Sequence, residues 1–257
     1  MSIDPPAIPG QLQLDLLTYD TAIDWPARLA REAPLLRRAL EAAPSRRVLD
    51  LGSGTGEHAR WLAGEGCTVV GIEGVEERWE AARRDAPPEV QFLLGDLGAV
   101  EAMVRGHFGT ALCLGDTLPA LLGVEALSRM FVGLRRRLLP GGPFVAHQLG
   151  YDRLVGQGTA ELPERRLEDA AGELVFRREL EMRDDGVVGV TDTVLRRPRE
   201  GQEELLRRRT RFHQGWRHEE LLTLLDVAGF RRVESFAGFA GEPFDPAASA
   251  ELVLVAS

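Results

Sequence analysis

The residues VLDLGSGTGEHARWLAG, at positions 48–64, constrain the fold more than any other part of the chain. An apolar run carries Asp50, and glycine then occupies three alternate positions, Gly52, Gly54 and Gly56, before a helical pattern begins. Glycine lets the backbone bend sharply and approach a bound molecule closely, and the first turn of a helix offers unpaired N–H groups. The segment therefore predicts a buried strand, a ligand-binding turn and a helix.

The same alternation of strand and helix continues to about residue 150. Strands that are apolar throughout and alternate with helices indicate a parallel sheet that is covered on both faces. We therefore expect an α/β fold with a doubly wound sheet. A helix over 25–40 should be broken at Pro34, because proline interrupts the helical hydrogen bonds. The predicted strands are 47–51, 68–72, 90–94, 110–114 and 144–147, and the predicted helices are 57–63, 75–84, 99–105 and 124–138.

After residue 151 the pattern changes to longer alternating runs that predict three antiparallel strands. Turn residues at 184–186 and 198–201 separate these strands. A helix at 218–228 and two strands at 231–236 and 251–256 end the chain. We expect three parts: an N-terminal helical segment (1–44), an α/β core (45–152 and 216–257) and a small antiparallel β insertion (160–215).

Composition excludes several classes of protein. The net charge of −9 argues against a general nucleic-acid binder. Cys67 and Cys113 lie in apolar runs, which is typical of reduced core residues and not of a disulfide framework or a zinc site. No apolar run approaches the roughly 18 residues of a membrane span, and the N-terminus does not resemble a signal peptide. We expect a cytoplasmic protein without a metal, and the sequence does not predict an oligomeric state.

The glycine turn departs from two common nucleotide-binding patterns. A dinucleotide fingerprint G-x-G-x-x-G would need its third glycine at the position of Glu57, and the G-K-[ST] of a P-loop is absent. Asp50 before the turn would repel a diphosphate. It suits a ligand that carries a positive group.

D-L-G-S-G-T-G after an apolar strand resembles motif I of the class I S-adenosylmethionine-dependent methyltransferases. The resemblance implies a seven-stranded Rossmann-like sheet with a reversed C-terminal hairpin, in which the last strand lies antiparallel between the fifth and sixth strands. It also implies S-adenosylmethionine as the cofactor. Asp50 would face its amino-acid end, Glu73 its ribose hydroxyls and Asp96 its adenine amino group, with Leu97 against the ring. The full set that would bind the cofactor is Arg28, Asp50, Gly52, Ser53, Gly54, Gly56, Glu73, Gly74, Asp96, Leu97, Leu114, Gly115 and Asp116.

Within this superfamily, the small-amine enzymes such as glycine N-methyltransferase are the most similar. Arg28 matches their arginine that pairs with the cofactor's carboxylate, and Leu114-Gly115-Asp116 resembles their leucine-glycine-asparagine turn. Their H-R-N-Y-D becomes H-Q-L-G-Y-D from residue 147 onward. Tyr151 and Asp152 match, whereas leucine and glycine replace the arginine and asparagine, which argues against glycine itself as the substrate.

The expected activity is methyl transfer to a small-molecule acceptor by in-line displacement. His147 or His213 could accept a proton, and Tyr151 could orient the acceptor. His213 shares one side of a predicted strand with Arg207, Arg209 and Arg211, which suits either a lid over an acidic substrate or an exposed sheet face.

Two aromatic side chains near the N-terminus, Tyr19 and Trp25, could close over the cofactor or anchor the first helix. Two alternative functions are a nucleotide-dependent oxidoreductase and a non-catalytic protein that binds S-adenosylmethionine. In a methyltransferase, the N-terminal helix and the insertion would form a lid that excludes water.

Overall fold

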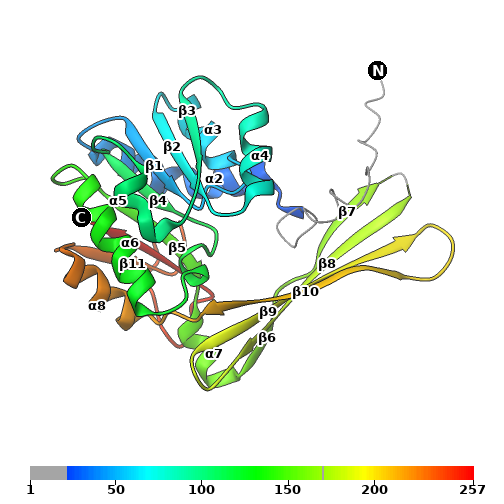
Figure 1. The fold of residues 1–257 in the computed structure, drawn as a ribbon. Helices are drawn as coiled ribbons and strands as arrows, with labels where there is room; N and C mark the ends of the chain where they lie inside the picture. Colours follow the sequence, from blue (N-terminus) through cyan, green and yellow to red (C-terminus); the bar gives the residue numbers. More distant parts are fainter. Residues whose placement is uncertain (1–21, 170) are drawn as a thin grey trace. The chain divides into compact units, whose positions relative to one another are not determined.

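The computed structural model of the chain describes residues 22–169 and 171–257 (Figure 1). The chain forms two compact units. The core unit contains Trp25–Gly156 and Gln214–Ser257, and the insertion unit contains Gln157–His213 together with residues 22–24. Tyr19, for which we expected a cofactor or anchoring role, lies outside the described residues.

A seven-stranded sheet forms the centre of the core unit, in the order β11-β12-β5-β4-β1-β2-β3. Strand β12 pairs antiparallel with both β5 and β11, whereas the other neighbouring strands run parallel. This confirms the doubly wound sheet and the reversed C-terminal hairpin. The strands are β1 Arg47–Leu51, β2 Thr68–Glu73, β3 Val90–Leu94, β4 Thr110–Cys113, β5 Phe144–Leu149, β11 Val233–Phe236 and β12 Glu251–Ala256.

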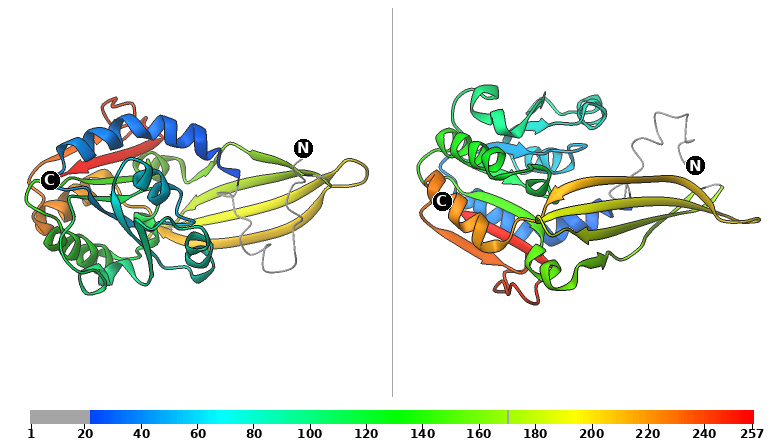
Figure 2. Two further views of the ribbon diagram at one scale, coloured as in Figure 1. Left: turned by 90° about the horizontal axis from the view of Figure 1, so that it is seen from above. Right: turned by 60° about the horizontal axis from the view of Figure 1, so that its bottom comes forward.

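Helices cover both faces of this sheet: α2 lies on one side, and α6 and α8 lie on the other (Figure 2). The helices are α2 Trp25–Ala42, α3 Glu57–Gly64, α4 Glu76–Arg84, α5 Val100–Met103, α6 Val124–Arg137, α7 Tyr151–Gln157 and α8 His218–Ala228, with short 3-10 turns η2 Leu97–Ala99 and η3 Leu118–Ala120.

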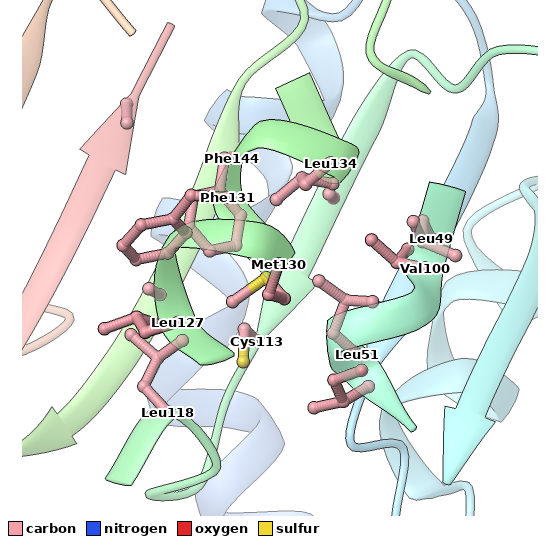
Figure 3. Packing of buried hydrophobic residues seen from close by; sticks show 14 of the residues in the cluster. Leu49, Leu51, Val100, Cys113, Leu118, Leu127, Met130, Phe131, Leu134 and Phe144 are labelled. Carbon is pink, nitrogen blue, oxygen red and sulfur yellow. The ribbon is translucent and has the colours of Figure 1, made fainter. Parts of the chain in front are cut away.

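Two hydrophobic clusters hold these layers together. In one, Met130 and Phe131 of α6 pack towards Leu49 and Leu51 of β1 and Phe144 of β5 (Figure 3). In the other, residues of α2 and α3 pack against the opposite side of the same strands. Because each strand of the sheet centre is buried on both faces, its sequence is apolar at nearly every position.

The insertion unit is an antiparallel sheet with the order β10-β9-β8-β6, and β7 also pairs with β8. Strands β6, β7 and β9 each run antiparallel to β8. A small apolar cluster contains Leu174, Phe176 and Val194. The strands are β6 Thr159–Glu161, β7 Arg165–Asp169, β8 Gly172–Met182, β9 Val187–Pro198 and β10 Glu204–Gln214.

Several predicted elements differ from the structure. Helix α2 runs unbroken through Pro34, because burial of Leu35, Leu36 and Ala39 offsets the hydrogen bond that proline removes. The insertion has five strands, whereas three were predicted. Strands β6 and β7 were not predicted because they are short and mostly polar and give no apolar signal. The short helix α7 was also missed. Strand β5 extends to Leu149, because its last two residues pair with β12.

Candidate active site

The turn between β1 and α3 is held against the end of β2. The N–H groups of Gly52 and Ser53 donate to the carbonyl of Ile72 at 2.8 and 3.0 Å. Gly52 has a φ of +72°, and a Cβ there would collide with the side chain of Thr117. Gly54 has a φ of +58°, but a Cβ there would find no atom within 4 Å. The turn is therefore packed at Gly52 and open at Gly54, which leaves room for a ligand.

Glu73 at the end of β2 is buried and braces the same turn. Its Oε2 accepts the N–H of Gly54 at 2.8 Å, and its Oε1 accepts the N–H of Val75 at 2.8 Å. Each carboxylate oxygen can accept more than one hydrogen bond. Both oxygens therefore keep capacity for a pair of hydroxyl donors. Gly74 lies between these residues, in the loop that leaves the strand.

Asp50 is the most unusual residue of the turn. It lies in β1 just before the turn, it is 2% exposed, and its Oδ2 is buried without a hydrogen-bond partner. Burial raises the pKa of Asp50 to about 6, and the charge of Glu73 adds to this effect, whereas His58 and Arg28 oppose it. A buried carboxylate oxygen without a partner is costly and is well suited to a cationic donor from a ligand.

Helix α2 brings a guanidinium to the neighbouring strand end. Arg28 Nε donates to Glu32 Oε1 at 2.8 Å, and the guanidinium lies 4.8 Å from the centre of the Trp25 ring. A Cβ added to Gly115, just after β4, would lie 3.2 Å from Arg28 Nη2. The observed contacts of Trp25 are with Arg28 and with the ring of His58, whose centre is 5.3 Å away.

Two further residues of this region, Glu32 and His58, were not predicted from the sequence as part of the site. Glu32 is fully buried, and its Oε2 lies 2.6 Å from His58 Nε2. Burial alone would raise the pKa of Glu32, but the hydrogen bond and charge of His58, together with Arg28, lower it to about 2. The i,i+4 spacing of Arg28 and Glu32 was a readable signal, whereas the pairing with His58 crosses from one helix to another.

The ends of β4 and β5 form a second polar group. Asp116 has a φ of +67°, which is uncommon for a residue other than glycine. Its Oδ1 accepts the N–H of Leu149 at 3.1 Å, and its Oδ2 accepts the O–H of Tyr151 at 2.8 Å. Leu114, which precedes Gly115, is buried in the core and accepts a hydrogen bond from Thr117 at its carbonyl.

His147 lies in β5 beside this group. Its Nδ1 accepts the N–H of Gly115 at 3.3 Å, so the ring hydrogen of the neutral form is on Nε2. Nε2 lies 3.7 Å from Glu251 Oε2, and the ring centre is 5.3 Å from that of Phe239. Nε2 is buried and has no hydrogen-bond partner among the described residues, so the hydrogen bond that the ring makes is the one that holds the Gly115 N–H.

The predicted adenine end is more open. Asp96 is exposed, and its Oδ1 accepts the N–H of Gly98 at 2.9 Å as the cap of η2. Leu97 is buried within the core cluster. Ser53 has a buried Oγ without a hydrogen-bond partner, and Gly56 has a φ of +90° at the start of α3. One oxygen of Asp96 thus has a local role, and the other stays available to a ligand.

The structure brings most of the predicted residues to one edge of the core sheet, where the parallel strands have their carboxyl ends. This group comprises Arg28, Asp50, Gly52, Ser53, Gly54, Gly56, Glu73, Gly74, Asp96, Leu97, Leu114, Gly115, Asp116, His147 and Tyr151.

His213 belongs to the other unit. It is buried there, and its Nε2 accepts Arg211 Nε at 3.3 Å. Arg211 pairs with Asp192, which also binds Arg178 through two contacts of 2.6 and 3.0 Å. Burial opposes ionisation of Asp192, but the two arginines lower its pKa overall. A catalytic role for His213 stays a prediction.

Within residues 22–169 and 171–257, no three His, Cys, Asp or Glu side chains are grouped as metal ligands would be. In the same described part of the chain, no helix has the length and apolar character needed to cross a bilayer.

Comparison with known proteins connects this geometry to a family. Residues 48–142 match the methyltransferase domain family. The glycine/sarcosine N-methyltransferase of Parasynechococcus marenigrum (strain WH8102) is 30% identical over 145 residues, which is 55% of this chain and 51% of that protein. The enzyme of the same name from Aphanothece halophytica is 27% identical over 143 residues, 54% of each chain. The chain thus spans about half the length of the curated relatives it matches.

Solved structures extend the similarity over the whole fold. The CcbJ methyltransferase from Streptomyces caelestis has a TM-score of 0.70 at 27% identity, over 89% of this chain and 88% of that one. The sugar N-methyltransferase KedS8 from Streptoalloteichus sp ATCC 53650 has a TM-score of 0.69 at 19% identity, over 99% and 96% of the two chains, which supports the fold alone. The chain therefore has the fold of S-adenosylmethionine-dependent methyltransferases, and residues 48–142 are similar to a methyltransferase domain.

Proposed function

We propose that the protein transfers the methyl group of S-adenosylmethionine to the nitrogen of a small-molecule amine other than glycine. One observation carries the cofactor half of this proposal. Asp50 offers a buried carboxylate oxygen without a partner, and Arg28 presents its guanidinium to the same edge of the sheet. The amino acid of the cofactor is a zwitterion, so an anion and a cation set near one another match its two ends.

The remaining residues fit the rest of the cofactor. Glu73 keeps acceptor capacity for the ribose hydroxyls, the open side of Gly54 leaves space, and Asp96 with Leu97 would receive the adenine. When bound, the cofactor supplies a methyl group made electrophilic by its sulfonium.

For the acceptor, we propose the pair of Asp116 and Tyr151. Tyr151 donates to one oxygen of Asp116 and Leu149 N–H donates to the other, so the carboxylate is held in one orientation. A carboxylate so held can accept a hydrogen bond from an amine and favour its approach. The similar proteins named as glycine/sarcosine and sugar N-methyltransferases support nitrogen as the acceptor atom.

Glycine itself does not suit this site. The family's arginine that holds the substrate carboxylate is replaced by Leu149, and the following asparagine is replaced by Gly150. We therefore expect an amine whose binding does not require a residue at these positions to hold a substrate carboxylate. The amino pentose methyltransferase CalS10 from Micromonospora echinaspora and KedS8 share the fold, which makes amino sugars a reasonable class to test first.

The two histidines have different places in this proposal. His147 acts as a positioning residue that holds Gly115 by its N–H, and the amine loses its proton to Asp116 or to solvent. His213 contributes only if the insertion serves as the lid over the acceptor, and that lid remains part of the proposal.

The oxidoreductase alternative has less support. The N–H groups of Gly52, Ser53 and Gly54 donate to Ile72 and Glu73 and leave no donors at these positions for a diphosphate. A non-catalytic protein would share the cofactor site and would differ only in forming no product. We further propose a cytoplasmic location, since both cysteines are free and buried, as in proteins of reducing compartments.

A transfer assay tests this function. The purified protein is incubated with S-adenosylmethionine that carries a labelled methyl group and with separate pools of amino sugars, amino acids, phenols and carboxylic acids. We expect labelled product and S-adenosylhomocysteine in an amine pool, with little or none from glycine. Labelling confined to phenols or acids would overturn the acceptor class. Binding of the cofactor without product in any pool would favour the non-catalytic alternative.

A further inference from the structure

The buried glutamate of α2 needs an explanation beyond folding. Glu32 is 0% exposed and lies among buried apolar neighbours of the helix, including Ala33, Leu35 and Leu36. Removal of a carboxylate from water is costly, and a buried pair of charged groups gains little over apolar side chains of the same size. Helix packing alone would therefore be served equally well by an apolar residue at this position.

The two oxygens of Glu32 hold two different elements. Oε1 accepts Arg28 Nε at 2.8 Å within α2, and Oε2 meets His58 Nε2 at 2.6 Å. His58 is the second residue of α3 and follows the glycine turn directly. The more exposed Arg31 lies 3.8 Å from Oε1 and also pairs with Glu251 at 3.4 Å. Glu32 thus ties the N-terminal helix to the helix that starts at the cofactor turn.

The same contacts fix the direction of the Arg28 guanidinium. Glu32 occupies only Nε, and no hydrogen bond from either Nη reaches another side chain or carbonyl within the described residues. The Trp25 ring lies against the guanidinium, and Gly115 lies in front of Nη2. An arginine that is fixed at Nε presents both Nη donors as a fork, which is the geometry that binds a carboxylate through two parallel hydrogen bonds.

We propose that Glu32 is a positioning residue for cofactor binding, which holds Arg28 ready for the carboxylate of the cofactor's amino-acid end. The inference rests on the proposed function, because it assumes that Arg28 meets this carboxylate. Glu32 itself does not touch the cofactor. Its effect should therefore be confined to ligands that carry the amino acid.

Two ligands separate this role from a structural one. S-adenosylhomocysteine carries the amino acid, whereas 5′-methylthioadenosine has the same nucleoside and sulfur without it. Calorimetry of Glu32→Asp measures affinity for both, since this change keeps the charge but shortens the side chain so that it cannot reach both partners. We expect the affinity for S-adenosylhomocysteine to fall about tenfold, because one charge-assisted contact becomes misaligned. The affinity for 5′-methylthioadenosine should stay within about twofold of the wild-type value.

Three further variants sharpen the test. Glu41→Asp makes the same change at an exposed position of α2 and should alter neither affinity. Glu32→Gln keeps the length and should lose less affinity than Glu32→Asp if position matters more than charge. In an Arg28→Ala background, Glu32→Asp should have almost no further effect on S-adenosylhomocysteine, because the residue that it positions is gone.

The outcomes are distinct. Equal losses for both ligands, or an unchanged affinity for S-adenosylhomocysteine in Glu32→Asp, would overturn the positioning role, and so would a failure of both Glu32 variants to fold. If the wild-type protein bound neither ligand, the proposed function itself would fail. If wild type bound S-adenosylhomocysteine and Glu32→Asp did so equally well, only this inference would fail.

Discussion

The core and insertion units each bury a carboxylate between two basic side chains. In the core the carboxylate lies on a helix, and in the insertion it lies on a strand. In the core, Glu32 lies between Arg28 and His58, beside a glycine turn that holds a carboxylate oxygen without a partner. In the insertion, Asp192 lies between Arg178 and Arg211.

The backbone accounts for the second cluster more fully than for the first. Arg178 and Asp192 are direct cross-strand partners of β8 and β9, which is a common way for a sheet to stabilise itself. No such pairing joins Glu32 to His58, which lie on separate helices. The comparison suggests that the core cluster serves a ligand site and that the insertion cluster serves the stability of the sheet.

The glycine turn should give the largest effect. Gly52→Val forces a branched side chain into Thr117 at a φ of +72°, so we expect the affinity for S-adenosylhomocysteine to fall more than about 100-fold. Gly64→Ala is the control, because Gly64 is helical and a Cβ there meets no atom within 4 Å. That variant should bind normally and melt at an equal or higher temperature. Binding by Gly52→Val within tenfold of wild type would contradict a ligand site at this turn.

The two buried aspartates should respond to pH in opposite directions. Burial raises the pKa of Asp50 to about 6 without ligand, so below pH 6 the residue is increasingly neutral and cannot pair with the ligand's ammonium. The affinity for S-adenosylhomocysteine should therefore fall by up to about tenfold per pH unit below 6. Calorimetry over about three pH units, from roughly pH 5 to pH 8, would measure this fall because the range includes the pKa of Asp50. Asp50→Asn should bind weakly and without the pH dependence, and a wild-type affinity that is flat with pH would contradict the role of Asp50.

For folding, the raised pKa of Asp50 means that the ligand-free protein loses stability as pH rises through the interval between 3.8 and about 6, where the folded state binds the extra proton. The lowered pKa of Asp192 has the reverse effect. Its contribution is present above its ordinary pKa of about 4 and is lost as pH falls further.

Asp192→Asn should reduce stability without reducing ligand affinity. The change leaves the buried Arg178 and the half-buried Arg211 without their shared charge, and we expect about 3 kcal/mol of lost stability, visible in chemical denaturation. Glu200→Gln, at an exposed turn of the same unit, should be neutral. If Asp192→Asn instead weakened ligand binding by tenfold at unchanged stability, the two clusters would not differ in the way proposed.

The smallest effect is expected at the acceptor end. Asp116→Asn keeps one oxygen acceptor and tolerates the positive φ, so the protein should fold and bind S-adenosylhomocysteine normally. With an amine acceptor, kcat/KM should fall about tenfold because the charge that receives the amine is lost. An unchanged kcat/KM would remove Asp116 from the acceptor site.

The sequence was most informative where backbone geometry restricts residue type. Gly52, Gly54 and Asp50 were readable because a tight turn with positive φ admits few residues other than glycine, and a carboxylate beside it is chemically unusual. The parallel, doubly wound arrangement of the core followed from apolar runs that alternate with helices, whereas the antiparallel place of the last strand was implied by the resemblance to the methyltransferase family. These features depend on short stretches of chain, so their signals survive in the sequence.

Contacts between distant elements were not readable. The hydrogen bond between Glu32 and His58 joins α2 to α3, and the hydrogen bond of Tyr151 to Asp116 spans 35 positions. The unbroken helix through Pro34 depends on burial of its neighbours, which propensity alone does not reveal. Strands β6 and β7 are short and polar, and only their pairing with β8 defines them.

The central claim is that Asp50 and Arg28 recognise the zwitterionic end of the cofactor. Calorimetry of the wild-type protein with S-adenosylhomocysteine and with 5′-methylthioadenosine under identical conditions tests this claim directly. The measurement is made at about pH 7.5, roughly 1.5 units above the pKa of Asp50, so that its carboxylate is ionised. The account predicts that the amino acid improves affinity by about 100-fold or more, as two charge-assisted contacts should. Equal affinities for the two ligands would contradict it.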